Sequence, residues 1–287
     1  DALANKHSVD VNQVTVGCGS VGLLQQAFMA YVDAGDEVVY PWRSFEVHPV
    51  FSAIAEAKAV TVPLDGQSFD LEAVAAAVTD QTKLVILSTP NNPTGTVCST
   101  EDLNHLLGSI NSEVVVIIDE AYLEFVTDES VANAVTEILP HHSNAAVFRT
   151  FSKAYGLANL RVGYAVGHPE VIGAIDKVAL PFLVNGLAQT AVLASLEPQA
   201  ETELKARVDE VITERSRVST ELEAQGWPVT PSQANFVWLP VEEQAGALFQ
   251  RLESMGVVTR PFENEGLRVT VGSPAENDRF LEVIGPR

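Results

Sequence analysis

KLVILSTPNNPTG (residues 83–95) and EVVVIIDEAY (residues 113–122) each join a short apolar run to a polar turn. The runs LVIL and VVVII do not alternate between apolar and polar residues, as expected for strands that helices cover on both faces. Sheets of this kind are mainly parallel, and their ligands bind at the carboxyl ends of the strands. The two stretches therefore predict a covered parallel sheet with a polar site along one edge.

Similar apolar runs alternate with helical patterns along the first 184 residues. Strands are expected at residues 11–16, 37–40, 58–64, 83–88, 113–119 and 145–151, and helices at 20–33, 45–57, 71–79 and from Thr100. This order predicts an α/β fold of three layers around a mainly parallel sheet. We expect residues 1–184 to form this large domain.

The pattern changes near residue 185. A long amphipathic helical stretch covers residues 185–225, where Pro198 can break the helix. Strands are then expected at 235–239, near 257–261 and at 267–271, with helices at 241–255 and at the end of the chain. Residues 185–287 are therefore predicted to form a connecting helix and a small α+β domain.

Composition excludes several classes of partner. Asp and Glu total 38 against 17 Lys and Arg, which gives a formal charge of -21 and repels nucleic acid and anionic membranes. No run approaches the roughly 20 apolar residues that span a bilayer. The two cysteines, Cys18 and Cys98, have neither metal-type spacing nor a disulfide framework. We expect no metal site and a cytoplasmic location.

A glycine-rich turn, GCGSVG at residues 17–22, lies between an expected strand and an expected helix. With Asp36 further on, it matches a dinucleotide-binding pattern and raises the alternative of an NAD-dependent dehydrogenase. The same turn can bind any phosphate through free amides at the helix N-terminus, or can simply be a tight turn capped by Ser20.

Polar side chains also lie at or just after the carboxyl ends of three successive strands. They are Asn92, Asp119, Tyr122, Thr150, Ser152 and Lys153, with Arg161 eight residues beyond the lysine. Each has an ordinary structural explanation, such as a turn, a helix cap or a solvated charge. Their position at the ends of parallel strands predicts instead that they share one pocket.

These segments resemble the fold-type I aminotransferases, which use pyridoxal 5'-phosphate (PLP), and in particular the histidinol-phosphate and aromatic aminotransferase branch. The resemblance rests on STPNNPTG (88–95), DEAY (119–122), TFSKA (150–154), LRVG (160–163) and LRVTVG (267–272). It covers nearly the whole chain in order. WRSFE (42–46) and the turn at 17–22 depart from the histidinol-phosphate pattern and favour the aromatic enzymes.

The resemblance implies how PLP is held. Lys153 would bind the aldehyde and move the proton at the substrate α-carbon, and Asp119 would keep the pyridine nitrogen protonated. Asn92 and Tyr122 would hydrogen-bond the phenolic oxygen. The residues implied to bind the phosphate or stack on the ring are Ser20, Val21, Phe45, Thr150, Ser152 and Arg161.

The resemblance also implies the reaction. Arg268 would bind the substrate α-carboxylate, and Arg260 would line the same cleft. We expect transamination between an aromatic amino acid and a 2-oxo acid; the alternatives are histidinol phosphate as the donor, a related PLP decarboxylase, or a PLP-binding regulator without enzymatic activity. The family forms homodimers with an N-terminal arm, and that arm would precede Asp1 of this sequence.

Overall fold

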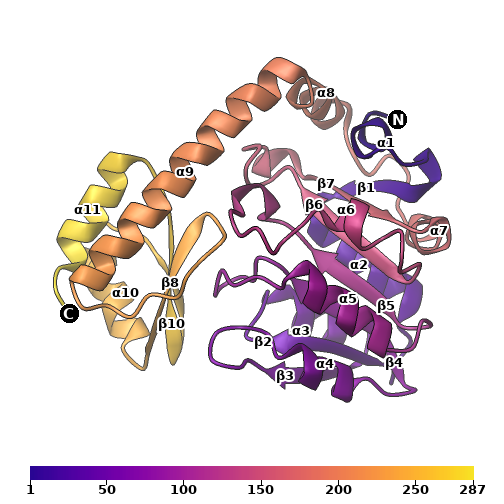
Figure 1. Ribbon diagram of the computed structural model, residues 1–287, viewed down its shortest axis with the longest axis horizontal. Helices are drawn as coiled ribbons and strands as arrows, with labels where there is room; N and C mark the ends of the chain where they lie inside the picture. The colour runs from indigo at the N-terminus through magenta and orange to yellow at the C-terminus, as the bar shows by residue number, and fades with distance from the viewer.

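The computed structural model describes residues 1–287 and places a seven-stranded sheet between two layers of helices (Figure 1). Six strands point in the same direction, whereas β7 is antiparallel to both of its neighbours, β6 and β1. In spatial order the strands are β1 (Val14–Cys18), β7 (Val162–Gly167), β6 (Ala145–Thr150), β5 (Val115–Asp119), β4 (Thr82–Ser88), β2 (Glu37–Trp42) and β3 (Lys58–Pro63). The predicted three-layer α/β fold is confirmed.

The central strands are buried on both faces because their successive side chains enter two different cores. In β5, Val116 and Ile118 belong to one core, and Val115 and Ile117 to the other. The first core is covered by α4 (Leu71–Ala77), α5 (Thr100–Ser109), α6 (Ala134–Glu137) and α8 (Gly186–Ser195). The second is covered by α2 (Gly19–Tyr31), α3 (Val47–Ile54) and α7 (Pro169–Lys177).

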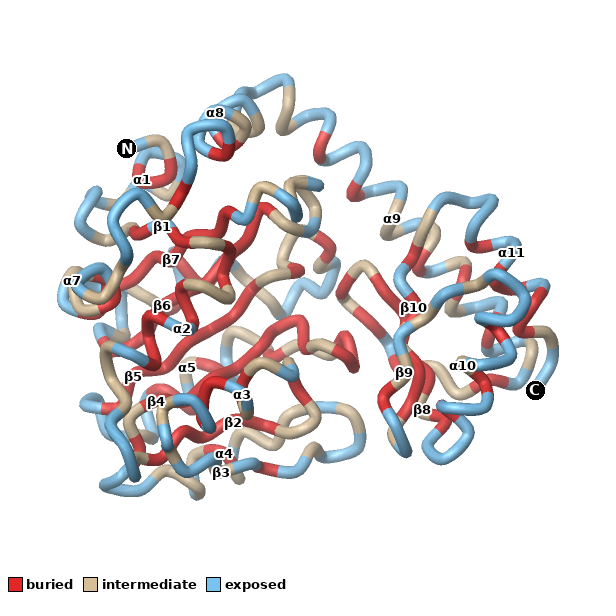
Figure 2. The backbone as a smooth tube through the Cα atoms, turned by 180° about the vertical axis from the view of Figure 1, so that it is seen from behind, coloured by how far each residue is buried: buried red, intermediate tan, exposed pale blue.

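A second sheet has its own core near the C-terminus. Its strands are β8 (Phe236–Glu242), β10 (Glu265–Thr270) and β9 (Arg260–Phe262), paired antiparallel in that order. The helices α10 (Ala245–Ser254) and α11 (Pro274–Ile284) and the end of α9 (Pro198–Ala224) complete this core. Figure 2 shows buried residues concentrated in both sheets.

The long helical stretch is broken where the sequence predicted. Glu197 occupies the N-cap position of α9 and Pro198 is the first residue of the helix, where the missing amide hydrogen of proline is not needed. Ala188 and Val192 of α8 pack into a core of the large sheet, so α8 lies against the large domain and α9 makes the connection. The domain boundary at residues 184 and 185 stays a prediction.

Several elements were not predicted: α1 (Ala2–His7), α6, α7, strand β7 and the short 3-10 helices η1 (Val11–Gln13), η2 (Leu123–Phe125) and η3 (Ala158–Leu160). Strand β7 contains two glycines, which weaken any strand pattern. A Cβ on Gly163 would lie 2.3 Å from the backbone nitrogen of Ser20. Gly163 therefore lets the N-terminus of α2 approach the sheet.

No helix is both long and apolar enough to cross a membrane.

Candidate active site

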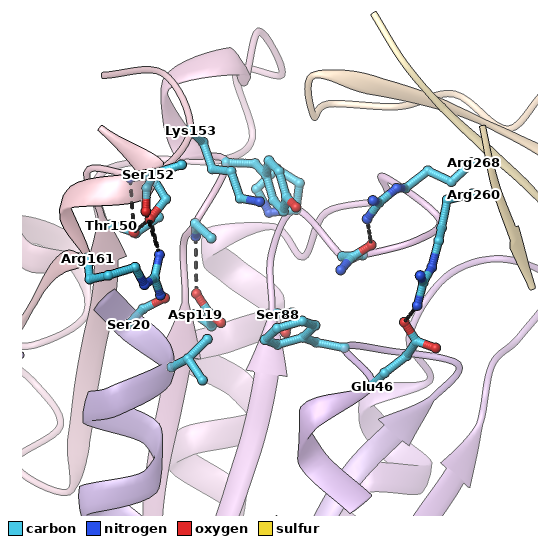
Figure 3. A pocket seen from close by; sticks show the side chains of 17 residues that line it. Ser20, Glu46, Ser88, Asp119, Thr150, Ser152, Lys153, Arg161, Arg260 and Arg268 are labelled. Atoms are coloured by element: carbon cyan, nitrogen blue, oxygen red, sulfur yellow. Dashed lines mark hydrogen bonds and ion pairs between the residues drawn. The ribbon is translucent and has the colours of Figure 1, made fainter. Parts of the chain in front are cut away.

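A cavity of about 340 Å³ lies where the carboxyl ends of the parallel strands face the small sheet. All of the predicted site residues line it: Ser20, Val21, Phe45, Asn92, Asp119, Tyr122, Thr150, Ser152, Lys153, Arg161, Arg260 and Arg268. Figure 3 shows Arg161 and Ser152 on one side of this cavity and Arg260 and Arg268 on the opposite side. Segments far apart in the sequence thus meet in one place.

One end of the cavity is formed by Arg161 and the N-terminus of α2. The Arg161 guanidinium donates to the Ala158 carbonyl at 2.8 Å and lies 3.4 Å from the Ser152 hydroxyl. Gly19 has φ +72°, and a Cβ there would lie 2.5 Å from the guanidinium. Glycine therefore allows the charge to approach the helix end, where the first amides have no partner within the helix. This combination suits a phosphate group.

Ser152 is held in this corner by Thr150. The Thr150 hydroxyl donates to the Ser152 hydroxyl at 2.9 Å and accepts from the Ser152 amide at 3.1 Å. Thr150 is the last residue of β6 and Ser152 lies two residues beyond it, so the strand end fixes their position. The predicted phosphate-binding side chains are therefore preorganised.

Asp119 ends β5 at the base of the cavity and is 7% exposed. Its carboxylate accepts one hydrogen bond, from the Ala121 amide at 3.2 Å, and makes no ion pair. Burial raises the pKa of Asp119 to about 6, although the Ala121 amide and the Lys153 charge act in the opposite direction. A buried carboxylate without a cation is suited to pair with a protonated nitrogen of a bound group.

Lys153 brings an amine to the same cavity. Its Nζ lies 5.1 Å from the centre of the Tyr122 ring, within the range of a cation–π contact. The side chain makes no ion pair and points into the cavity (Figure 3). Lys153 is therefore free to react with a bound molecule.

The opposite end of the cavity carries two arginines from the small sheet. Arg268 donates through Nη1 to the Asn92 side-chain oxygen, while its buried Nε has no partner. Burial lowers the pKa of Arg268. Arg260 donates to Glu46 at 2.8 Å. This end of the cavity therefore suits an anionic group.

The structure adds lining residues that the sequence did not single out. Glu46 belongs to the quoted WRSFE segment, but its pairing with Arg260 spans 214 residues of chain and has no local signal. Ser88 is the last residue of β4, and its buried hydroxyl has no hydrogen-bond partner. The position of Ser88 at the end of an expected strand was the sequence signal that could have identified it as a lining residue.

No cluster of side chains able to hold a metal ion is present.

Glu120 follows Asp119 but takes no part in the cavity. Its carboxylate accepts from Arg149 Nε at 2.8 Å, and the two side chains are 2% and 7% exposed. Burial opposes the charge on Arg149, but the carboxylate of Glu120 raises the pKa of Arg149 above its usual value. Two adjacent buried carboxylates therefore differ: Glu120 is paired and Asp119 is not.

Comparison with known proteins agrees with this geometry. The family described as aminotransferase class I and II matches residues 1–284. An aromatic amino acid aminotransferase from Mycobacterium marinum (strain ATCC BAA-535 / M) is 50% identical over 268 residues, which make up 93% of this chain and 73% of that protein. Another from Streptomyces coelicolor (strain ATCC BAA-471 / A3(2) / M145) is 48% identical over 282 residues, 98% of this chain and 78% of that protein.

A solved structure shares the fold. Histidinol-phosphate aminotransferase from Sinorhizobium meliloti, in complex with pyridoxal-5'-phosphate, matches with a TM-score of 0.91 at 29% identity and covers 99% of this chain and 79% of that chain. The fold and the family predicted from the sequence motifs are both confirmed. This chain belongs to the class I and II aminotransferases.

Proposed function

We propose that this chain binds PLP in the cavity described above and transfers an amino group between an aromatic amino acid and a 2-oxo acid. The observation that carries the proposal is the unpaired, buried carboxylate of Asp119 in the same cavity as the free amine of Lys153. A protonated pyridine nitrogen supplies the missing cation for Asp119, and an aldehyde supplies a reaction partner for Lys153.

The remaining lining residues fit the other parts of this cofactor. Arg161, Ser152 and the amides at the start of α2 would hold its phosphate. Phe45, which also lines the cavity, would lie against the ring, and Tyr122 and the side-chain nitrogen of Asn92 would donate to the phenolic oxygen. PLP, when bound, withdraws electrons from the substrate α-carbon. Lys153 is the base that would move the proton at that carbon.

Arg268 gives the site its substrate orientation. A guanidinium binds a carboxylate through two parallel hydrogen bonds, and the buried Nε of Arg268 lacks a partner that such a carboxylate would supply. The Asn92 oxygen already positions Nη1 of the same guanidinium. We therefore assign Arg268 to the α-carboxylate of the amino acid.

An aromatic donor is the preferred substrate. Its support is the identity of 48–50% to aromatic amino acid aminotransferases, against 29% to the histidinol-phosphate enzyme. The second candidate is histidinol phosphate, favoured by the presence of Arg260, a second cation, in the cavity. Amino-acid biosynthesis is the proposed context of either reaction.

We further propose a homodimer in the cytoplasm. A hollow of about 450 Å³ beside β1 and α8 is lined mainly by apolar side chains, among them Val11, Val16 and Leu193, which are 57%, 44% and 54% exposed. Exposed apolar side chains grouped in this way favour a protein partner, and a second copy of the chain is the proposed one.

The proposed cytoplasmic location is supported by the two free cysteines, because a reducing compartment keeps thiols from forming disulfides.

The test is to measure amino transfer by the PLP-loaded protein with phenylalanine, tyrosine and histidinol phosphate as donors and 2-oxoglutarate as the acceptor. We expect the highest kcat/KM with an aromatic donor. A Lys153→Ala variant should bind PLP without the visible absorption change of the wild-type protein and should lose turnover. Preference for histidinol phosphate, or release of carbon dioxide without an acceptor, would contradict the proposal.

A further inference from the structure

The Glu46–Arg260 pair closes one side of the cavity between the two sheets. Glu46 is the N-cap residue of α3, a helix that packs on the large sheet, and Arg260 begins β9 of the small sheet. Their 2.8 Å contact is visible in Figure 3, below and beside Arg268. Both side chains line the cavity. The charge that Arg260 presents to a substrate is therefore set in part by Glu46.

Two arginines in one cleft fit a substrate with two anionic groups. Arg268 has an unfilled donor, whereas Arg260 already has a carboxylate partner within the protein. A substrate whose far end is a carboxylate or a phosphate must displace Glu46 from Arg260. A substrate with an uncharged ring at that end leaves the pair intact.

We propose that Glu46 is a specificity-determining residue that disfavours substrates with an anionic side chain and thereby favours uncharged aromatic ones. This inference rests on the proposed function, which orients the substrate α-carboxylate toward Arg268. Glu46 would thus make the site prefer an aromatic amino acid over histidinol phosphate as the amino donor. Glu46 acts by neutralising Arg260 and by repelling a second anion.

The expected effect is moderate because the pair is accessible to water. The Arg260 and Glu46 side chains are 57% and 47% exposed, and an exposed ion pair changes an equilibrium by no more than about fivefold. Glu46 can therefore be displaced, so an acidic 2-oxo acid still enters as the amino acceptor. The pair biases the choice of substrate without excluding anions.

Two unreactive ligands isolate this effect in the PLP-loaded protein. Glutarate and 3-phenylpropionate each offer one carboxylate to Arg268, but the far end is a second carboxylate in the first and a phenyl ring in the second. Calorimetry gives a dissociation constant for each. In Glu46→Gln we expect the affinity for glutarate relative to 3-phenylpropionate to rise by up to about fivefold.

Two further variants serve as controls. Glu263 lies in the exposed turn between β9 and β10. Glu263→Gln removes the same charge from a chain of net charge -21 without freeing Arg260, so the affinity ratio should stay at the wild-type value. In the double variant Glu46→Gln with Arg260→Gln, the rise should disappear.

The outcomes separate this inference from the proposed function. An unchanged ratio in Glu46→Gln, or an equal rise in Glu263→Gln, contradicts the role of Glu46. A rise that persists without Arg260 contradicts it as well. Absence of phenylalanine turnover in the wild-type protein contradicts the proposed function instead, because the binding ratio does not depend on turnover.

Discussion

Replacement of Asp119 by asparagine should stabilise the cofactor-free protein while it impairs cofactor binding. The carboxylate is 7% exposed and has no cationic partner, so burial raises its pKa from 3.8 to about 6. Asparagine has nearly the same shape, and its side-chain oxygen can keep the hydrogen bond from the Ala121 amide. The substitution therefore removes little except the buried charge.

The size of the effect follows from the two pKa values. The folded state keeps the Asp119 proton up to a higher pH than the unfolded chain, so stability falls as pH rises from about 4 to about 6 and stays reduced above that. At about 1.4 kcal/mol per pKa unit, the ionised carboxylate costs roughly 3 kcal/mol at pH 8. The advantage of Asp119→Asn should shrink to about 0.5 kcal/mol at pH 4.

Urea unfolding of the cofactor-free proteins at pH 4, 6 and 8 measures this difference. Glu120→Gln is the matched control, because it changes the neighbouring buried carboxylate in the same way. In Glu120→Gln the buried charge of Arg149 is left without its carboxylate partner, so this variant should be destabilised by about 3–5 kcal/mol. Adjacent amide substitutions should thus have effects of opposite sign.

The same Asp119→Asn variant should bind PLP roughly tenfold more weakly or worse, since a hydrogen bond to a charged group contributes about 1.5–3 kcal/mol. A spectroscopic titration gives this affinity. If Asp119→Asn were no more stable than the wild-type protein at pH 8, or if its advantage did not diminish toward pH 4, Asp119 would not be a destabilising buried charge.

Three other perturbations test the site and its support. His48 is fully buried without a hydrogen-bond partner, and burial lowers its pKa to about 3. As pH falls the unfolded chain binds the His48 proton before the folded state does, so the free energy of unfolding of the wild-type protein should fall by about 2 kcal/mol between pH 7 and pH 5 because of this group. In urea unfolding, His48→Phe should lose about 2 kcal/mol less than the wild-type protein over this range, whereas His105→Gln, at an exposed position, should lose as much as the wild-type protein. Gly163→Ala brings a Cβ to 2.3 Å from the Ser20 nitrogen, so it should destabilise the protein by about 1–3 kcal/mol and weaken PLP binding. Thermal unfolding measures the first effect and a PLP titration the second. Gly173→Ala, with open space around the added Cβ, should show neither effect. Arg268→Lys keeps the charge but loses the paired donors, so kcat/KM for phenylalanine should fall roughly tenfold to hundredfold; an unchanged value would place the α-carboxylate elsewhere.

The sequence alone determined the fold class, and it predicted for a local reason that the polar residues at the strand ends share one pocket. Apolar strands such as LVIL and VVVII must be covered on both faces, and the residues directly after parallel strands necessarily reach one edge of the sheet. Asp119 and Lys153 could therefore be assigned to one pocket from chain position. The helix break at Pro198 was likewise local, because proline fits the first turn of a helix.

Only the tertiary structure decided what depends on contacts between distant segments. The reversed strand β7 was not predicted, because its glycines weaken the strand pattern. Gly163 is needed there because the backbone of Ser20 approaches it, and these two residues are far apart in the sequence. The pairing of Glu46 with Arg260 joins two surface-type residues that carry no local pattern. The raised pKa of Asp119 depends on burial, which follows from packing. Charge balance inside the site is thus a property of the assembled chain, since it is set by which groups the fold brings together and how far it excludes water from them.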